Sequence, residues 1–314
     1  MNTHKPASSV FMVHPTSFGF DEQTARSNTF QRHLDADASA ISAKAQAEFK
    51  AAIAKLRRHG ITVVDFRDPS PVPKPNAVFP NNWLTTWPDG RVVLYPMATE
   101  SRRRERTADA LKALTKEFQI TDTIDLSAAE QTGVYLEGTG VIIFDHIHRV
   151  AYASISVRCD EELCAHHLRD LGYRPVIFHA YANGMPVYHT NVLMGVQTAT
   201  AVVCAESITE EAERRRVMES LEGTGHEVVT ITEDQMGRFC GNVIELQNAD
   251  GERFLVMSQT AHDAFIPAQR EILGRDKTLL PLEIPTIEAI GGGSARCMIA
   301  EVFLPRAVMA AAAK

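Results

Sequence analysis

The sequence predicts an α/β protein built from a repeated unit of a β-hairpin, a helix and a further strand. Segments typical of strands and of helices alternate along the chain of 314 residues. The strands that follow the helices begin near Ile61, Ile120, Arg174, Glu227 and Thr278, a spacing of roughly 50 to 60 residues that is typical of repeat architectures. Each strand holds about four to six apolar residues, as expected for sheets that are covered on both faces.

Local signals place the individual elements. Gly60 ends the first long helix, and the turns Pro88-Asp89-Gly90 and Asn248-Ala249-Asp250-Gly251 join hairpin strands, whereas the Pro-rich stretch 69–75 is an extended connector. We expect strands at 10–13, 61–66, 83–87, 91–95, 120–126, 140–144, 150–156, 174–179, 191–196, 201–205, 227–231, 242–247, 253–258, 278–284 and 298–304, and helices at 38–59, 102–118, 160–171, 210–223 and 261–274.

Five such units could close in a ring in which each unit buries its sheet face against the next. An open α/β sheet is the alternative, but no Gly-x-Gly-x-x-Gly motif follows a strand, so a dinucleotide-binding fold has no specific support. We expect a single domain at 10–305, flanked by a flexible tail at 1–9 and a C-terminal tail at 306–314.

The composition excludes several classes of partner. Hydrophobic residues make up 45% of the chain and charged residues 23%, which is ordinary for a globular protein. The net charge is −7 and there is no long basic patch, which argues against nucleic acid. No apolar run reaches the roughly 18 residues of a membrane span, and the N-terminus lacks the apolar core of a signal peptide. Five scattered cysteines without a Cys-x-x-Cys pair indicate reduced thiols and a cytoplasmic protein.

The glycine-rich loop from Gly291 to Gly293 leads directly to Arg296 and Cys297. Consecutive glycines allow the backbone to approach a ligand closely. A thiol beside a cation that favours its thiolate is a candidate nucleophile. The alternative for Cys297 is a buried structural cysteine after a flexible turn.

Alignment of the units brings unusual polar residues to equivalent positions. Asn82, Glu137, His189, Asn242 and Cys297 all lie where a unit begins. In a closed ring these unit starts converge at one end of the axis and surround one pocket. A thiolate can attack a carbon, a histidine can move protons, and a carboxylate can hold substrate N–H groups. Taken singly, the histidine could instead be a partly buried structural residue, and the glutamate could hold the turn that follows it.

At these residues the sequence resembles the guanidino-group-modifying, or amidinotransferase, superfamily, in particular its arginine-deiminase-related branch of citrulline-utilisation hydrolases. The resemblance covers nearly the whole chain and implies a five-bladed α/β propeller (pentein fold), with Cys297 as nucleophile, His189 as general acid/base and Glu137 as hydrogen-bonding carboxylate. The motifs that carry it are Met12-Val13-His14-Pro15, Asn28-Thr29-Phe30-Gln31, Phe79-Pro80-Asn81-Asn82-Trp83, Tyr95-Pro96-Met97, Arg102-Arg103, Glu105-Arg106, Cys240-Gly241-Asn242 and Gly291 to Cys297.

Two departures from this pattern bear on the substrate. Arginine-cleaving relatives place an aspartate where Asn82 stands, and arginine deiminases place another where Asn191 stands. A buried guanidinium that faces amides would lose charge-assisted hydrogen bonds of roughly 1.5 to 3 kcal/mol each. A neutral ureido group has no such need, and an amide can donate to its oxygen. The two asparagines therefore favour citrulline over arginine.

The expected reaction is hydrolysis of citrulline to ornithine, ammonia and carbon dioxide through a covalent cysteine intermediate. Arg296 and the protonated imidazolium of His189 would favour the thiolate, and the amides of Asn82 and Asn242 would hold the planar head group. Arg102 is a candidate for the substrate α-carboxylate because arginine offers a bidentate fork, although it could equally be a solvated arginine at a helix start. No step needs a metal ion or an organic cofactor.

Other clusters fit structural roles better. The stretch Asp145-His146-Ile147-His148 contains metal-ligand residue types, but we interpret it as a polar hairpin turn. Cys164-Ala165-His166-His167 lies on a predicted helix, where neighbouring residues do not share a face. Cys240 could line the pocket, without an assigned chemical role.

The sequence alone leaves several other functions open. An arginine or substituted-arginine deiminase or dihydrolase, an amidinotransferase and a catalytically silent amino-acid-binding propeller all fit the chain. The expected partner is a small amino acid, and the sequence leaves the oligomeric state open, a homo-oligomer included.

Overall fold

The computed structural model describes residues 5–33 and 37–307 of the chain, so residues 1–4 of the predicted N-terminal tail and residues 308–314 of the predicted C-terminal tail lie outside the described residues. Its strands form five three-stranded sheets and one two-stranded sheet. In each three-stranded sheet the central strand pairs antiparallel with the first strand and parallel with the third. The same three-stranded arrangement therefore occurs five times, as the spacing of the sequence predicted.

Four of these sheets follow the chain order. They consist of β3 (Leu84–Thr86), β4 (Arg91–Leu94) and β5 (Asp122–Asp125); β6 (Ile142–Asp145), β7 (Val150–Ser154) and β8 (Arg174–Phe178); β11 (Met194–Val196), β12 (Thr200–Val203) and β13 (Glu227–Thr230); and β14 (Ile244–Gln247), β15 (Arg253–Ser258) and β16 (Thr278–Leu282). The two-stranded sheet is β9 (Tyr181–Ala182) with β10 (Met185–Pro186).

The fifth sheet joins the two ends of the chain. It has the order β17 (Ala300–Glu301), β1 (Ser9–Val13) and β2 (Thr62–Phe66), with Phe11 opposite Ala300. Ala7 also bridges Leu246, and both Ala7 and Ser9 are buried, so this end of the predicted tail packs against the core. Among the described residues the sheets are separate and none closes on itself, so the ring stays a prediction.

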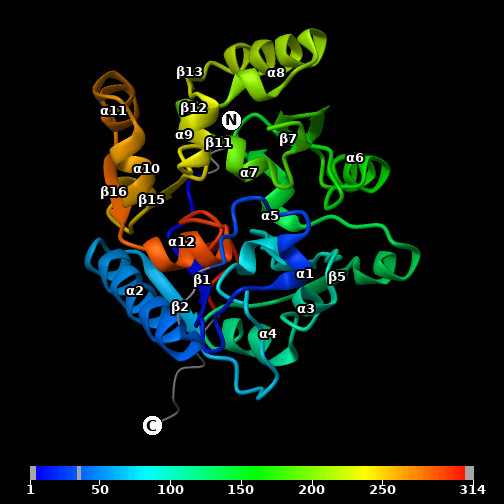
Figure 1. The fold of residues 1–314 in the computed structure, drawn as a ribbon, viewed down its shortest axis with the longest axis vertical. Coiled ribbons are helices and arrows are strands. Elements are labelled where there is room, and N and C mark those ends of the chain that lie inside the picture. Colours follow the sequence, from blue (N-terminus) through cyan, green and yellow to red (C-terminus); the bar gives the residue numbers. More distant parts are fainter. Residues whose placement is uncertain (1–4, 34–36, 308–314) are drawn as a thin grey trace.

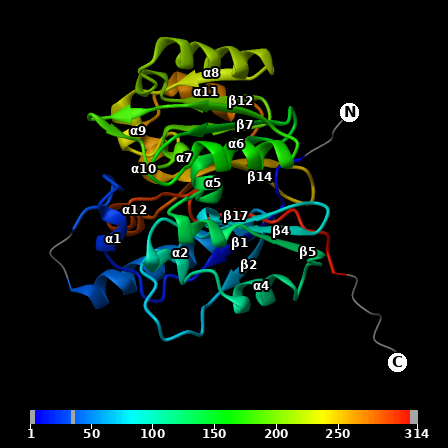
Figure 2. The same cartoon turned by 90° about the vertical axis from the view of Figure 1, so that its right-hand side faces the viewer.

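The longer helices connect the second and third strands of the units. These are α2 (Ala38–Arg58), α4 (Ala108–Leu114), α6 (Glu161–Asp170), α8 (Glu211–Gly223), and the pair α10 (Gln259–Ala264) and α11 (Pro267–Gly274). Figure 1 shows α2, α11, α8 and α6 at the outside of the molecule, with β1 and α12 (Pro285–Gly291) nearer its centre, and Figure 2 shows α8 and α2 at opposite ends. No helix within the described ranges is long and apolar enough to cross a membrane.

Three predicted elements are wrong in extent. The helix at 102–118 is two helices, α3 (Glu100–Arg103) and α4, because the Thr107 side chain accepts a hydrogen bond from Ala110 N–H and starts a new helix. The helix at 261–274 divides at Pro267, which lacks an N–H and occupies the first position of α11. The strand at 298–304 is reduced to β17.

Single-turn helices open three of the units, and two of them, at 138–141 and 190–193, overlap the beginnings of the strands expected at 140–144 and 191–196. They are η1 (Pro80–Asn82), α5 (Gly138–Val141) and α7 (Thr190–Leu193), and α5 packs against both of the others. Each carries a predicted site residue in it or directly before it, so their packing brings these residues together. The remaining short helices are α1 (Glu22–Ala25), η2 (Ser127–Thr132), η3 (Ala205–Ser207) and α9 (Glu233–Gly237).

Candidate active site

The glycine-rich loop holds Cys297 in the interior of the protein. Gly292 ends α12 with φ +62°, in the left-handed region that favours glycine. The loop then turns back through Ser294, whose carbonyl accepts from Cys297 N–H at 3.0 Å and whose hydroxyl donates to Glu288 at 2.6 Å. Cys297 is 2% exposed, but it lines a cavity, so burial does not make it an inert structural thiol.

Two side-chain amides donate to the cysteine sulfur. Asn191 Nδ2 lies 3.4 Å from Sγ and Asn242 Nδ2 lies 3.2 Å from it. The Asn242 carbonyl oxygen accepts from Arg296 N–H at 3.0 Å, which fixes the amide's orientation toward the sulfur. Neither asparagine lines the cavity, so the structure places both on the nucleophile and not on a substrate head group as predicted. Their N–H groups stabilise negative charge that develops on the sulfur.

His189 and Glu137 form a buried hydrogen-bonded pair. His189 Nε2 lies 2.7 Å from Glu137 Oε2, and the Tyr188 ring packs against the imidazole at an interplanar angle of 36° with ring centroids 4.5 Å apart. Glu137 also accepts from Ala98 N–H through Oε1 at 3.0 Å and from Arg158 through Oε2 at 3.2 Å. The carboxylate therefore orients the imidazole, and Oε1 keeps one lone pair for a further donor.

Burial sets the charge of this pair. Burial lowers the pKa of His189 to about 4, although the hydrogen bond to Glu137 acts in the opposite direction. Burial alone would raise the pKa of Glu137, but the charge of Arg158 and the hydrogen bond from His189 outweigh it and hold that pKa well below its ordinary 4.5. Near pH 7 the carboxylate is ionised and the imidazole is neutral. The predicted imidazolium is therefore absent from the resting site.

Arg296 does not accompany the cysteine as predicted. Its guanidinium donates to the Ile299 carbonyl at 2.8 Å and lies 3.1 Å from Glu301, and it lines a different cavity. Adjacency in sequence therefore did not place the guanidinium next to the sulfur. Arg296 is corrected from a site residue to a structural partner of Glu301.

Arg102 lies beside the cavity but is already held by the protein. It donates to both oxygens of Glu105 at 2.8 and 2.9 Å, to the Phe79 carbonyl at 2.8 Å and to Asn82 Oδ1 at 2.7 Å. These bonds use four of its five N–H groups. Arg102 is therefore buried in an ion pair with Glu105 and is not a solvated arginine. It orients Asn82, whose Nδ2 is buried and has no hydrogen-bond partner among the described residues.

Arg158 is a site residue that the sequence analysis missed. It is 1% exposed and connects Glu137 to the segment around α1, donating to the Thr24 carbonyl at 3.0 Å and to Ser27 Oγ at 2.8 Å. Its one signal in the sequence is a lone arginine beside the buried Cys159 after an apolar strand. That pattern gives no direction for the side chain.

The cavity is small and is lined mainly by polar residues. Its space is about 260 Å³ with the open mouth included, below the range usual for small-molecule sites, and Thr24 and Asn28 of the N-terminal segment line part of it. Asn28 attaches that segment to the glycine-rich loop by donating to the Gly292 carbonyl at 3.2 Å. The lining residues are Thr24, Asn28, Asn76, Phe79, Asn82, Arg102, Arg158, Tyr188, His189, Gly291, Gly292, Gly293 and Cys297.

The other cysteine and histidine candidates lie outside this cavity. Cys240 donates to the Ala261 carbonyl, and burial raises its pKa to about 12. His167 packs on Tyr95 with its Nε2 3.1 Å from the phenolic oxygen, whereas His166 lies at the surface beside Asp170. Cys240, His166 and His167 are therefore not part of the candidate active site.

Comparisons with solved structures find proteins of similar fold. The N-terminal domain of ArgZ, an arginine dihydrolase from Cyanobacteria whose cysteine-to-serine variant was solved with substrate, is 16% identical, with a TM-score of 0.70 over 94% of this chain and 99% of that one. Unliganded AgrE is 15% identical with a TM-score of 0.72, and the match covers 96% of this chain but only 40% of AgrE. A dimethylarginine dimethylaminohydrolase adduct with S-methyl-L-thiocitrulline is 13% identical, with a TM-score of 0.62 over 94% of this chain.

At these identities the solved structures show a shared α/β fold. No curated protein matches the chain. The family model described as N,N dimethylarginine dimethylhydrolase, eukaryotic, matches residues 14–304. The chain therefore belongs to the N,N dimethylarginine dimethylhydrolase family, within the guanidino-group-modifying pentein enzymes.

Proposed function

We propose that this protein hydrolyses a C–N bond of a ureido or guanidino amino acid through a covalent intermediate on Cys297, with citrulline as the preferred substrate. The observation that supports citrulline is the unpaired amide nitrogen of Asn82. Arg102 donates to its Oδ1, so the amide nitrogen is the atom left without a partner, beside the cavity. An unpaired buried N–H donor is costly unless a ligand accepts from it, and a ureido oxygen is such an acceptor.

The reaction begins with Cys297 as a thiol and His189 as a neutral imidazole. As the sulfur attacks the ureido carbon, the Cys297 proton passes to the neutral imidazole of His189, and Asn191 and Asn242 stabilise the sulfur as charge develops. Glu137 stabilises the imidazolium that forms, because its carboxylate already accepts from Nε2. The C–S bond forms and the carbonyl carbon becomes tetrahedral.

The second half releases the products. The imidazolium of His189 protonates the departing nitrogen, the first C–N bond breaks, and an S-carbamoyl thioester of Cys297 that keeps the second nitrogen remains. Water activated by the neutral imidazole then cleaves the C–S bond and regenerates the thiol, and the carbamic acid released breaks its remaining C–N bond to give the second amine and carbon dioxide. For citrulline the sum is one water consumed, with ornithine, ammonia and carbon dioxide produced. Arg158 and Arg102 both line the cavity, where their guanidinium groups suit the substrate carboxylate.

A second candidate is hydrolysis of arginine or a methylated arginine. It is favoured by the solved neighbours described as an arginine dihydrolase and as a dimethylarginine dimethylaminohydrolase, and by the anionic Glu137, whose Oε1 retains one lone pair for a guanidinium N–H. Both candidates use the same nucleophile and the same His189–Glu137 pair.

We also propose that the five three-stranded sheets stand as the blades of one five-bladed propeller. The pairing of β17 with β1 supports this arrangement because it joins the last unit to the first. All five cysteines are free thiols, which suits a reducing compartment such as the cytoplasm.

The test is product release from citrulline, arginine, agmatine and dimethylarginine, each offered separately to the purified protein. We expect ornithine and ammonia in equal amounts from citrulline, and none with Cys297→Ala. Two ammonia per ornithine from arginine, without citrulline turnover, would overturn the preference and support the second candidate.

Thiol labelling covers the non-enzymatic alternative. If the protein uses this mechanism, an alkylating reagent should label Cys297 faster than Cys240. His189→Ala should slow the labelling of Cys297, because the base that accepts the thiol proton is lost. No turnover of any of the four compounds together with equally slow labelling of both thiols would show a binding protein.

A further inference from the structure

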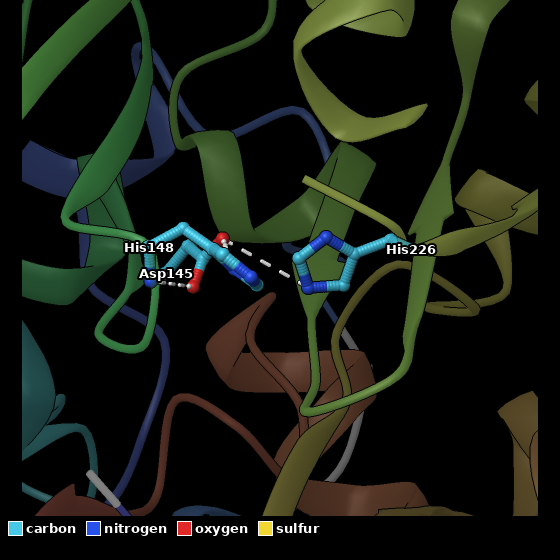
Figure 3. A group of neighbouring side chains, drawn as sticks. All are labelled: Asp145, His148 and His226. Atoms are coloured by element: carbon cyan, nitrogen blue, oxygen red, sulfur yellow. Dashed lines mark hydrogen bonds and ion pairs between the residues drawn. The ribbon is translucent and has the colours of Figure 1, made fainter. Parts of the chain in front are cut away.

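Three metal-ligand side chains meet in a second place, away from Cys297. Asp145 at the end of β6 and His148 in the following turn come from one unit, and His226, directly before β13, comes from the next. One ligand atom of each lies within 4.8 Å of the others. Figure 3 shows the imidazole of His226 facing Asp145 and His148 from a separate segment of the chain.

The turn itself prepares Asp145 as a ligand. Its Oδ1 accepts from the backbone N–H groups of Ile147 at 3.1 Å and His148 at 3.0 Å, which fixes the carboxylate plane. Its Oδ2 lies 2.8 Å from His148 Nδ1 and 3.9 Å from His226 Nε2. The predicted polar turn is therefore present, but its carboxylate presents the second oxygen to two histidines.

The charge of Asp145 needs a partner. Its side chain is 2% exposed, and its ion-pair partners among the described residues are the two histidines, with no lysine or arginine. Buried charges in proteins are paired or coordinate a metal ion. A hydrogen-bonded cluster of neutral imidazoles leaves the carboxylate without a countercharge, whereas a divalent cation supplies one.

The surroundings of His226 resemble those of a metal ligand. Its Nδ1 lies 2.9 Å from Thr224 Oγ1, which itself lies 3.0 Å from the Ser220 carbonyl and can therefore accept from Nδ1–H. In that tautomer Nε2 carries a lone pair that faces two acceptors, the Gln197 carbonyl oxygen at 3.0 Å and Asp145 Oδ2 at 3.9 Å, and a cation between these atoms would satisfy all three. Metal-bound histidines almost always donate their other N–H in this way. The Gln197 carbonyl, 3.0 Å from Nε2, is at hand as a further oxygen ligand.

We propose that Asp145, His148 and His226 bind a zinc ion, with the Gln197 carbonyl or water in the fourth position. Two imidazoles and a carboxylate suit tetrahedral zinc. Because the ligands come from two sheets, the ion would cross-link the β6–β7–β8 and β11–β12–β13 units. The cavity beside Asp145 shares no lining residue with the cavity at Cys297, so the role is structural. This replaces the expectation of a protein without a metal site.

The decisive measurement is zinc affinity of the full chain carrying Cys297→Ala, which removes the active-site thiol as a competing ligand. After treatment with a chelator and its removal, zinc is titrated in competition with a chromophoric chelator. We expect one equivalent to bind. Cobalt in place of zinc should give the intense visible absorption of a tetrahedral ion without a thiolate charge-transfer band, because no cysteine is in the ligand set.

Matched histidine variants in the same background locate the ion. His148 is partly exposed, so His148→Ala should fold, and we expect its zinc affinity to fall by at least about tenfold. His166→Ala removes a surface histidine outside the cluster and should leave the affinity unchanged. His226→Gln, with folding checked by circular dichroism, should match His148→Ala. Absence of binding to the parent, or equal affinity in all four proteins, would overturn the proposal.

Discussion

At the scale of single residues, Asn82 sets which head group the cavity accepts. Replacement by aspartate removes the amide N–H and places a carboxylate against the ureido oxygen. We expect Asn82→Asp to lower kcat/KM for citrulline by about 10- to 100-fold, since a hydrogen bond to a buried unpaired group is worth roughly 1 to 3 kcal/mol. The ratio of citrulline to arginine turnover in steady-state assays is the readout.

The neighbouring Asn81 provides the control for that substitution. It is equally buried and donates to Thr139 Oγ1, but it does not line the cavity. Asn81→Asp should therefore change stability and leave the substrate ratio as it is. The assignment of Asn82 is wrong if both aspartate variants keep the ratio of the parent.

Arg158 acts on the catalytic pair through its charge. It lowers the pKa of both Glu137 and His189. Arg158→Met removes that charge, so both pKa values should rise and the acid limb of the kcat/KM profile should move to higher pH. Loss of one partner of a buried pair also costs about 3 to 5 kcal/mol of folding stability.

The pH profile separates this electrostatic effect from simple loss of folded protein. Arg158→Lys retains a positive charge and should return the acid limb toward its original pH, even where the stability is not restored. An acid limb that is identical in the parent and in Arg158→Met would show that Arg158 only attaches the segment around α1.

At the scale of elements, the end of α12 depends on glycine at one position. A Cβ at Gly292 would lie 2.6 Å from Gln31 Cγ and 2.7 Å from Gln31 N, and φ is +62°. Gly292→Ala should therefore push the segment at 28–31 away from the loop, lowering both activity and the free energy of unfolding, the latter by about 1 to 3 kcal/mol. Urea unfolding and ornithine release measure the two effects.

Gly223 at the end of α8 is the matched control. A Cβ there meets no atom within 4 Å, and its φ is not positive. Gly223→Ala should leave the activity unchanged and stabilise the helix by up to about 1 kcal/mol. If Gly292→Ala behaves like Gly223→Ala, the close approach of loop and N-terminal segment is not needed for the active site.

The elements that the sequence predicted well are those with local signals. The helix before Gly60 and the strands that follow each helix appear within a few residues of their expected positions. The division at Pro267 could have been recognised from proline chemistry. The single-turn helices α5 and α7 could not, because their four residues form a helix only where the unit starts pack against one another.

For the candidate site, the sequence predicted which residues lie near one another but not the directions of their side chains. Repeat alignment placed Glu137, His189 and Cys297 in one region because equivalent positions of repeated units converge. It could not give side-chain directions, so it set Arg296 beside the sulfur and missed Arg158. Contacts between residues that are distant in sequence decide both cases: Arg296 meets Glu301 in β17, and Arg158 reaches the segment around α1.

At the scale of the whole molecule, the buried histidines couple folding to pH. Burial lowers the pKa of His189 and of His167 from the ordinary 6.5 to about 4 in the folded protein. Between these two values the unfolded chain binds protons at both positions and the folded chain does not. The free energy of unfolding therefore falls as the pH drops from about 6.5 to 4, by up to about 1.4 kcal/mol per pH unit for each group.

The lowered pKa of Glu137 acts in the same direction below its ordinary 4.5, because the unfolded carboxyl takes up a proton that the folded one does not. Urea unfolding between pH 7 and 4.5 lies above the range of Glu137 and measures the sum of the two histidine contributions. His189→Gln and His167→Gln should each flatten the profile by one group's share, and the surface substitution His166→Gln should not. Profiles of equal slope in all four proteins would mean that both buried histidines take up protons in the folded state, and the neutral imidazole that accepts the Cys297 proton would be wrong as well.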